Sequence, residues 1–221
     1  MRICTLPATV AFLLAAIVGC RNSNLDKGNI CLRLGDYPAA ISFYSEEVKD
    51  HPDGYLGRLG LGKALLQKAF DADTSAWKAA IVQLEAARTL SPAPDLGGLL
   101  AEVYLQRAHQ LLDAKDTVGA LDALSRSIES DKAAIEPLNL AGIIYYRLGE
   151  TDKSESLFAK AVGLDSANAS ARFNLGMVYW QSGKVKRAHE QWLAALIESP
   201  HDKDMLYWFA LAEKKLRETL P

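Results

Sequence analysis

The chain has 221 residues, of which 49% are hydrophobic and 24% charged, a composition typical of a folded protein rather than a disordered one. Lys and Arg number 25 and Asp and Glu number 27, so the net charge is close to zero and no block of basic residues stands out. Because binding to phosphates requires a concentrated positive face, this composition argues against a nucleic-acid partner.

The N-terminal segment differs from everything that follows it. Arg2 supplies a positive charge, and residues 6–18 form an apolar stretch that is too short to span a bilayer, which takes about 20 residues. This pattern predicts a signal peptide over residues 1–19. Residues 17–20, with the sequence IVGC, resemble the lipobox of bacterial lipoprotein signal peptides. The resemblance implies that Cys20 becomes the mature N-terminus and carries lipid, including palmitate; the alternative is a plain secretory signal.

Lipidation at Cys20 would anchor the chain at a membrane surface. Residues 20–24 would form a short tether, since four residues after the cysteine span at most about 14 Å, and several acyl chains give stable anchoring. Arg21 is not the Asp that retains some lipoproteins in the inner membrane, which favours an outer-membrane anchor facing the periplasm. With Cys20 lipidated, Cys31 has no intramolecular partner and is predicted to be a small core residue.

The remaining sequence, residues 25–221, repeats with a fixed period. Asn174-Leu175-Gly176 follows Leu140-Ala141-Gly142 by 34 residues. The same shift matches four more pairs, namely Gly149 with Gly183, Tyr145 with Tyr179, Phe158 with Trp192, and Ala161 with Ala195. A constant period of this length indicates stacked units that each bury their apolar face against a neighbour.

This pattern resembles the tetratricopeptide repeat family. The family's 34-residue unit has small or apolar residues at positions 7 and 8, Tyr at 11, often Gly at 15, Ala at 20, an aromatic residue at 24, Ala at 27 and Pro at 32. The resemblance implies an all-α fold, an α-solenoid of antiparallel helix pairs with interdigitated small and large residues. It predicts about five units, 21–54, 55–94, 95–134, 135–168 and 169–202, followed by a capping helix over 203–221.

The predicted units fit the pattern unequally. The first unit fits at Gly28, Gly35, Ala40, Tyr44 and Pro52. The second carries six extra residues between its halves, around residues 70–76, where turn-forming residues gather. The first helix of the third unit is weak or elongated, which leaves its register open. The fourth unit departs from the pattern at Ser154 and Ser166.

The last segment reads as one amphipathic helix that solvates the end of the stack. Its predicted inward residues are Leu206, Phe209, Ala210 and Leu216, and its predicted outward residues are Lys214, Lys215 and Arg217.

No group of residues predicts an enzyme, a metal site or a cofactor. The four histidines are scattered, and none has zinc-ligand spacing to another His or Cys. There is no nucleophile elbow and no glycine-rich phosphate loop. The run Asp71-x-Asp73-x-Ser75 opens like a calcium loop, but Ala76 and Val82 stand where the turn glycine and the bidentate Glu belong. We therefore expect no small-molecule substrate.

The resemblance implies instead a protein-binding groove, lined by positions 2, 5, 9, 12 and 13 of each first helix. The predicted groove residues are Asn139, Ile143, Tyr146, Arg147, Phe173, Met177, Trp180 and Tyr207. The spacing of Phe173, Met177 and Trp180 puts them on one helix face, off the predicted core, where they suit an apolar peptide or helix. The alternative is that the end helix covers them.

One binding mode of the family is not supported. Some of its members clamp a C-terminal carboxylate with Lys, Asn and Arg side chains. Asn29 could supply one such amide, but Gly60 stands where the next Asn is expected. The sequence therefore predicts a lipid-anchored adaptor or assembly factor, similar to pilotin-like and other envelope lipoproteins of this family. The alternative within this class is a scaffold for peptidoglycan enzymes.

Overall fold

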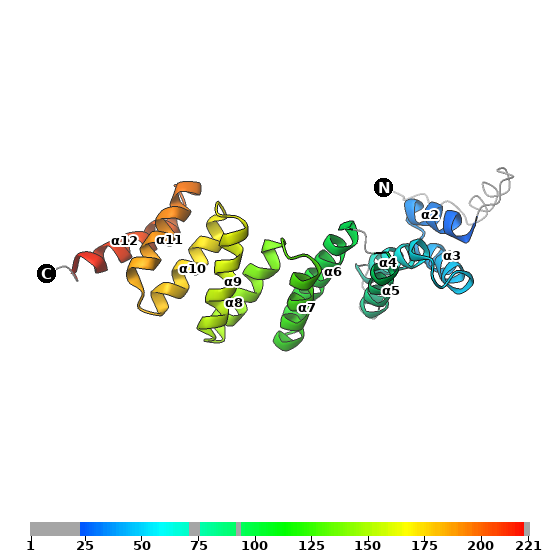
Figure 1. The fold of residues 1–221 in the computed structure, drawn as a ribbon, viewed down its shortest axis with the longest axis horizontal. Helices are drawn as coiled ribbons and strands as arrows, with labels where there is room; N and C mark the ends of the chain where they lie inside the picture. The colour runs from blue at the N-terminus through cyan, green and yellow to red at the C-terminus, as the bar shows by residue number, and fades with distance from the viewer. Residues whose placement is uncertain (1–22, 71–75, 92–93, 219–221) are drawn as a thin grey trace, which may run out of the picture. The chain divides into compact units, whose positions relative to one another are not determined.

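The computed structural model describes residues 23–70, 76–91 and 94–218. All regular structure within these ranges is helical, which confirms the predicted all-α class. The chain divides into two compact units, residues 1–92 and 93–221 (Figure 1). The first unit holds α2 (Asn24–Leu34), α3 (Tyr37–Asp50), α4 (Tyr55–Phe70) and α5 (Ala76–Leu90). The second holds α6 (Pro94–Asp113), α7 (Thr117–Ser130), α8 (Ile135–Arg147), α9 (Thr151–Leu164), α10 (Ala169–Gln181), α11 (Val185–Glu198) and α12 (Lys203–Glu218).

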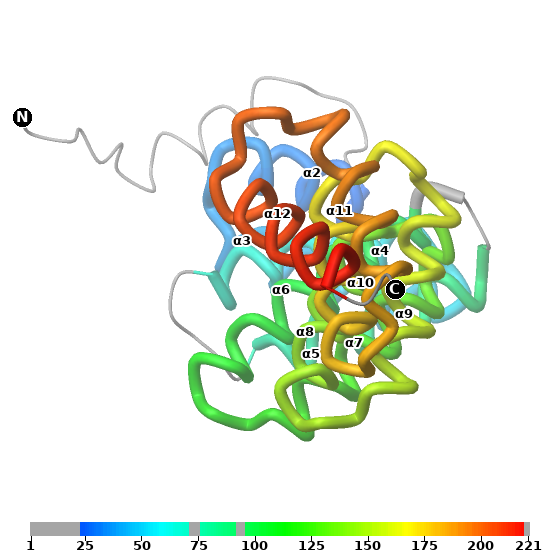
Figure 2. The backbone as a smooth tube through the Cα atoms, turned by 90° about the vertical axis from the view of Figure 1, so that its left-hand side faces the viewer, coloured from blue at the N-terminus to red at the C-terminus, as the bar shows by residue number. Residues whose placement is uncertain are grey.

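The helices pack as successive antiparallel pairs. The closest packing joins α2 to α3, α4 to α5, α6 to α7, α8 to α9 and α10 to α11. In each unit the second helix of one pair also packs on the first helix of the next, as α9 does on α10. At the C-terminal end α12, drawn in red in Figure 2, packs on α11. The predicted solenoid of helix pairs is therefore confirmed within each unit.

Polar caps and left-handed residues set the ends of the helices. Asp36, Asp116 and Asn168 each accept a hydrogen bond from the backbone N–H of the third residue of the following helix. Between the two helices of three pairs stands a glycine with positive φ, namely Gly35 at 76°, Gly149 at 78° and Gly183 at 72°. A glycine has no Cβ to clash in this conformation, which explains the residue at position 15 of the repeat.

The same turn resolves the register of the third pair. Lys115, with φ of 63°, occupies the left-handed position 34 residues before Gly149. The regular 34-residue unit therefore begins at Ala101, and α6, at 20 residues, carries about two extra turns before it. Of the two expected possibilities, a weak or an elongated first helix, the structure has the elongated one. The Gly97–Gly98 pair lies inside this extension.

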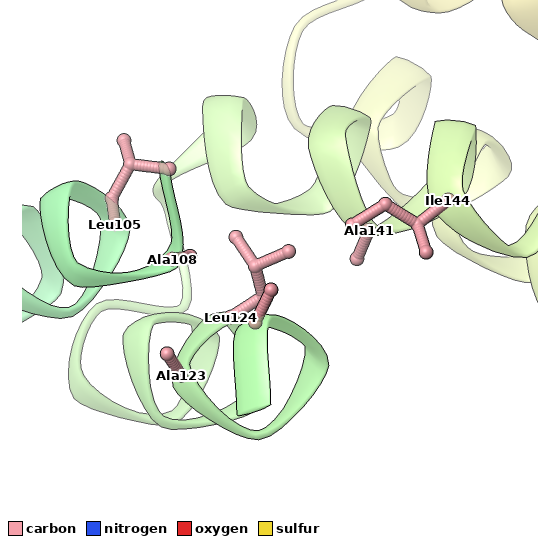
Figure 3. Close-up of a cluster of buried hydrophobic side chains, with 7 residues drawn as sticks. Leu105, Ala108, Ala123, Leu124, Ala141 and Ile144 are labelled. Carbon is pink, nitrogen blue, oxygen red and sulfur yellow. The ribbon is translucent and has the colours of Figure 1, made fainter. Parts of the chain in front are cut away.

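The repeat core pairs a small residue on the first helix with a large one on the second. The side chain at position 24 covers the residue at position 8, so Phe158 lies against Gly142 and Trp192 against Gly176. A Cβ at either glycine would collide with the aromatic ring. In the third pair Ala108 and Leu124 take these positions, and Leu124 lies between α6 and α8 (Figure 3). Each helix pair is thus closely packed, although the pairs differ in the sizes of the side chains at these two positions.

Two buried serines replace alanine without leaving a polar group unpaired. Ser154 is fully buried, and its hydroxyl donates to the carbonyl oxygen of Gly142 at 2.9 Å. Ser127 is also fully buried and donates to the carbonyl oxygen of Ala101 at 2.6 Å. The departure at position 154 is therefore accommodated, because a buried hydroxyl with a hydrogen-bond acceptor costs little.

The prediction for the end helix is right for Phe209, which packs on the stack, and for the half-buried Leu216, but it is wrong for Leu206 and Ala210. Leu206 is 45% exposed and Ala210 is also exposed, although both were expected to point inward. The residues that α12 turns toward the stack are Met205, Trp208, Phe209, Ala212 and Leu216, of which Met205 and Ala212 are buried. Leu206 and Ala210 each follow an inward-facing residue, and one residue along a helix rotates the side-chain direction by about 100°. Lys214, Lys215 and Arg217 are exposed as expected.

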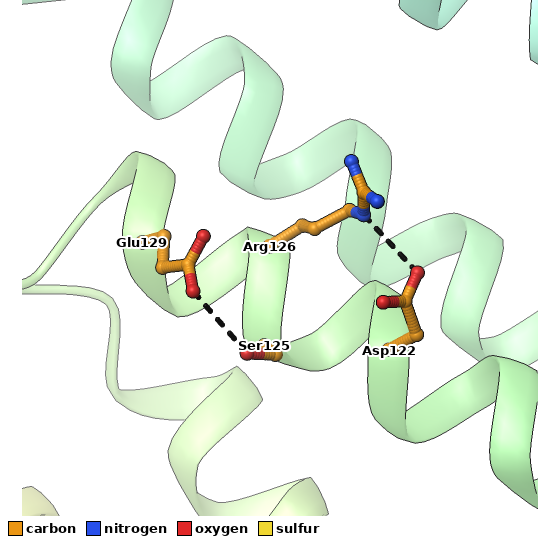
Figure 4. A network of polar contacts seen from close by, with 4 residues as sticks. All are labelled: Asp122, Ser125, Arg126 and Glu129. Atoms are coloured by element: carbon orange, nitrogen blue, oxygen red, sulfur yellow. Dashed lines mark hydrogen bonds and ion pairs between the residues drawn. The ribbon is translucent and has the colours of Figure 1, made fainter.

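The outer surfaces of the second helices carry polar pairs. On α7, Arg126 pairs with Asp122 at 3.1 Å, and the Ser125 hydroxyl donates to Glu129 at 3.5 Å (Figure 4). Such exposed pairs contribute about 0.2–0.5 kcal/mol each and keep this surface hydrated.

None of the described helices combines the length and the apolar character needed to cross a membrane.

Candidate functional site

The predicted groove residues of the fourth pair line one side of α8. Ile143 and Tyr146 are half-buried and pack on a cluster formed by Phe158, Leu175 and Val178. Arg147, in the last turn of α8, is exposed. Through these contacts α8 also meets α10 directly, so first helices of successive pairs are neighbours.

Asn139, one turn before Ile143, has a side chain that lacks a partner. Its Oδ1 atom is buried, and no donor among the described residues reaches it. The same repeat position holds Leu105 one repeat earlier and Phe173 one repeat later, so an apolar side chain would fit the pattern. A buried amide oxygen without a donor costs about 1–3 kcal/mol, so an apolar side chain at position 139 would be more stable.

Three residues of α10 were predicted to lie off the core, and this prediction is wrong. Phe173, Met177 and Trp180 are half-buried and pack on the cluster of Ala188, Trp192 and Ala212. The end helix covers part of them, because α12 contributes Ala212 and Trp208 to the same cluster. The remaining surface of each side chain is open to solvent.

Three tryptophans form the centre of this region. The Trp180 ring lies 5.9 Å from both the Trp192 and the Trp208 ring, and Trp192 and Trp208 are 5.7 Å apart between centroids. Trp192 is fully buried, and its Nε1–H donates to the carbonyl oxygen of Phe173 at 3.1 Å. Sequence reasoning missed Trp208, although an aromatic residue at helical spacing from Met205 and Ala212 was a usable signal.

The outer edge of the cluster combines an exposed tyrosine with a lysine. Tyr207 is 61% exposed and meets Trp208 edge-on at 5.6 Å between ring centroids. The Lys215 ammonium lies 4.8 Å above the Trp180 ring centroid, within cation–π distance. Lys215 was predicted to point into solvent, and its position over Trp180 was not anticipated.

The first helices α8, α10 and α12 are linked by packing of α8 on α10 and by the Trp180–Trp208 contact between α10 and α12. We call the predicted groove residues on these helices, without Arg147, the aromatic face. The aromatic face consists of Asn139, Ile143, Tyr146, Phe173, Met177, Trp180 and Tyr207. Large rings with restricted motion suit it to bind another apolar surface.

The corresponding surface of the first unit is built differently. Tyr44 is fully buried between Gly28 and Gly60, at both of which a Cβ would collide with its ring. Its hydroxyl donates to Oδ1 of Asn29 at 2.7 Å. This bond uses the Oδ1 acceptor of Asn29 and leaves its Nδ2 donors unused among the described residues, but an Asn side chain at position 60 would have no space beside the Tyr44 ring. The collision at Gly60 is the physical reason why the carboxylate clamp is incomplete.

Cys31 lies at the margin of the same cluster. It is half-buried rather than a full core residue, and no disulfide involves it. Burial, and next the negative charge of Asp36, raise the pKa of its thiol, which disfavours the reactive thiolate.

In the described part of the chain, no group of three or more His, Cys, Asp or Glu side chains could hold a metal ion. His189, on α11, is stacked on Phe209 at 4.5 Å between ring centroids. An open hollow at the turn between α3 and α4 is lined by residues including Leu25, Asp50 and Tyr55, and none of the predicted groove residues lines it. Cys20, the signal peptide and the Asp71-x-Asp73-x-Ser75 run lie outside the described residues.

Comparison with known proteins places this architecture. A family model described as tetratricopeptide repeat matches residues 25–93, 139–203 and 173–213, which together make up well over half of the chain. Among solved structures, the MamA protein is 23% identical over 90% of this chain and 94% of its own, with a TM-score of 0.50. YrrB, described as a TPR protein with an unusual peptide-binding site, is 21% identical over 89% and 96%, with a TM-score of 0.51.

A shorter neighbour carries a ligand. The first TPR of Spaghetti (RPAP3), bound to the HSP90 peptide SRMEEVD, is 17% identical over 54% of this chain and 98% of its own, with a TM-score of 0.52. At these identities the likeness concerns the fold.

Proposed function

Because this chain belongs to the tetratricopeptide repeat family, whose members mediate protein–protein interactions, we propose that it is a non-catalytic adaptor or assembly factor, held by lipid at the bacterial cell envelope. In this proposal the aromatic face binds a peptide or helix of a partner protein. The observation that carries it is the set of large apolar side chains on α10 and α12 that stay half-buried or exposed, from Met177 and Trp180 to Tyr207. An apolar surface left open in this way is typical of an interaction site.

Two structural neighbours support a peptide as the occupant. YrrB has a peptide-binding site, and Spaghetti is bound to a peptide. Their identity to this chain is too low to transfer the residues of those sites. The location on the aromatic face rests on the contacts and exposures of this chain alone.

A capture experiment tests the binding role. The full chain, tagged and crosslinked in its own cells, is compared with Tyr207→Ala and Tyr146→Ala by mass spectrometry of what co-purifies. We expect both variants to lose one specific partner, whereas Val118→Ala, at an exposed apolar residue of α7, keeps it. Unchanged recovery from both tyrosine variants would remove the basis for this proposal.

The identity of the captured partner separates the two roles within the adaptor class. An outer-membrane secretin or pilus component would indicate assembly of that complex, as in pilotin-like lipoproteins. Peptidoglycan hydrolases or synthases would indicate the scaffold.

The lipid anchor rests on the IVGC run at residues 17–20. Acyl chains on Cys20 would hold the first unit near the headgroups, since the tether is short. Labelled palmitate should enter the full chain and Cys31→Ala but not Cys20→Ala. Incorporation into Cys20→Ala would contradict the anchor. Fractionation of the labelled protein with the outer rather than the inner membrane is the expected location.

A further inference from the structure

The helix α2 lacks a cover that later first helices have. Ala64 of α4, Ile144 of α8 and Val178 of α10 stand at the tenth position of their repeats, and all three are buried. Each lies in a buried cluster with residues of the preceding second helix, which is α3, α7 or α9 respectively. The tenth position of α2, in the first of the described pairs, is Ile30, and this side chain is 41% exposed.

Ile30 belongs to a side of α2 that we call the open face, made up of Lys27, Ile30, Arg33 and Leu34. These residues lie three or four positions apart and therefore share one side of the helix. Leu34 is 70% exposed, and Arg33 is exposed as well. Lys27 is half-buried, with its ammonium 5.7 Å from the centroid of the Phe43 ring. The open face thus has two apolar side chains between two basic ones.

The first helix of the second unit, α6, is polar at the same repeat positions. Counted from Ala101, its seventh and tenth positions are Arg107 and Gln110, both half-buried. The Arg107 guanidinium donates to the side-chain oxygen of Gln110 at 3.3 Å. The end of a repeat array that meets water is expected to be polar. The first helix of the second unit follows this rule, whereas Ile30 and Leu34 of α2 do not.

The predicted lipid attachment point lies close to the open face along the chain. Cys20 precedes Asn24, the first residue of α2, by four residues, which span at most about 14 Å. Leu34 lies ten residues further, about 15 Å along the helix axis. If α2 lies parallel to the bilayer, the tether is therefore long enough for the open face to reach the headgroups.

We propose that the open face of α2 lies in the headgroup region of the leaflet that holds the acyl chains of Cys20, with Ile30 and Leu34 directed into the bilayer. This inference rests on the proposed lipid anchor and specifies which side of the first unit meets the membrane. Interfacial helices bury their apolar side about 5–10 Å into this region. The long side chains of Lys27 and Arg33 can extend along the apolar surface and keep their charges among the headgroups.

The charges around the open face are balanced. Asp26 lies in the first turn of α2, and Asp36 follows the C-cap of this helix. Together they offset the charges of Lys27 and Arg33. Burial of apolar surface, rather than attraction to anionic lipid, is therefore the source of affinity, and a neutral bilayer should suffice.

A fluorescent label on the open face tests the contact. The full chain with Leu34→Cys and Cys31→Ala carries the environment-sensitive fluorophore NBD at position 34 and is reconstituted into phosphatidylcholine vesicles. A second protein carries the label at position 82, through Val82→Cys, on an exposed residue of α5 in the same unit. We expect emission at a shorter wavelength from position 34 than from position 82. Phosphatidylcholine with a spin label near the headgroup should quench most of the emission from 34 and little from 82.

Matched substitutions locate the effect. Ile30→Asp should remove most of the quenching at position 34, because it places a charge in the contact, whereas Val82→Asp should leave it unchanged. Ile30 and Val82 are 41% and 53% exposed, so both variants should fold, which circular dichroism checks. Vesicles that also contain phosphatidylglycerol should give the same quenching, since the charges of the open face are balanced.

Several results would overturn the inference. Equal quenching at positions 34 and 82, or quenching that survives Ile30→Asp, would each do so. A short emission wavelength at position 34 without quenching would show that protein, such as a second copy of the chain, covers the open face instead. The lipid anchor is scored separately, by flotation of the chain with the vesicles. A chain that floats without quenching at position 34 keeps the anchor and refutes the contact, and a chain that does not float refutes both.

Discussion

The residues at position 24 of the first and last pairs, Tyr44 and Trp192, show how one packing rule leaves two different surfaces. Both are fully buried, lie against a glycine of the first helix, and donate a hydrogen bond to that helix. Around Tyr44 the neighbouring first-helix residues are small, as at Gly60, or engaged, as at Asn29. Around Trp192 they are large and half-open. The side chains around Tyr44 serve packing, whereas those around Trp192 leave apolar surface open to solvent.

The largest expected effect concerns the two tryptophans of the last pair. Trp192→Ala should lower the free energy of unfolding by about 3–5 kcal/mol, because it empties a fully buried site and breaks the bond to Phe173. Trp180→Ala should cost clearly less, since Trp180 is only half-buried. Urea denaturation followed by circular dichroism measures both. Equal losses would mean that Trp180 is as structural as Trp192 and would weaken the comparison.

Glycine positions under the aromatic rings come next. Gly60→Ala and Gly176→Ala should each destabilise the chain by about 1–3 kcal/mol, because a Cβ would collide with Tyr44 or Trp192. Gly98→Ala is the matched control, since open space surrounds that position within α6. It should be neutral or stabilising by up to about 1 kcal/mol. Thermal melts of the three variants report the difference, and destabilisation by Gly98→Ala would contradict this explanation.

Asn139 gives a smaller effect with the opposite sign. Asn139→Leu should raise the free energy of unfolding by about 1–2 kcal/mol, because it removes a buried oxygen without a donor. Leu105, buried at the equivalent position, shows that the repeat accepts leucine there. The same variant should capture less of the partner. Greater stability with unchanged capture would show that Asn139 does not serve binding.

The smallest effect lies in the turn of the third pair. Lys115→Gly should stabilise the chain by about 1 kcal/mol, because glycine adopts the left-handed conformation without a steric penalty. Gly183→Lys, the reverse change at the equivalent turn, should destabilise it by a similar amount. Chemical denaturation of both proteins tests the pair. A loss of stability in Lys115→Gly would mean that the lysine side chain contributes contacts that outweigh its strain.

Much of the fold could be predicted because the repeat places small and large residues at fixed positions. A glycine and the aromatic ring that packs on it recur 34 residues apart, as Gly142 with Phe158 and as Gly176 with Trp192. This packing can be predicted from the sequence alone. The third pair obscured it, since Lys115 replaces the turn glycine and Ala108 with Leu124 replaces the glycine–aromatic pair. Only the backbone conformation at Lys115 reveals the register.

The candidate site was harder to predict for a different reason. A repeat pattern places Trp180 on the first-helix surface but does not say what lies over it. In α12, every residue from 205 to 212 is apolar or aromatic, a run that covers the whole helix circumference. Neighbouring faces of the helix therefore looked equally apolar. Assigning Leu206 and Ala210 to the inward face in place of Trp208 and Ala212 left the contacts of Trp208 and Lys215 with Trp180 unpredicted.

The central claim, that the aromatic face is where a partner binds, is tested most directly by site-specific photocrosslinking in the cell. A benzophenone amino acid replaces Tyr207 in one protein and Val118 in another. Both positions are well exposed, at 61% and 81%, and both lie in the second unit. We predict a discrete crosslinked partner from position 207 and none from position 118. A partner attached at 118 but absent at 207 would contradict the account.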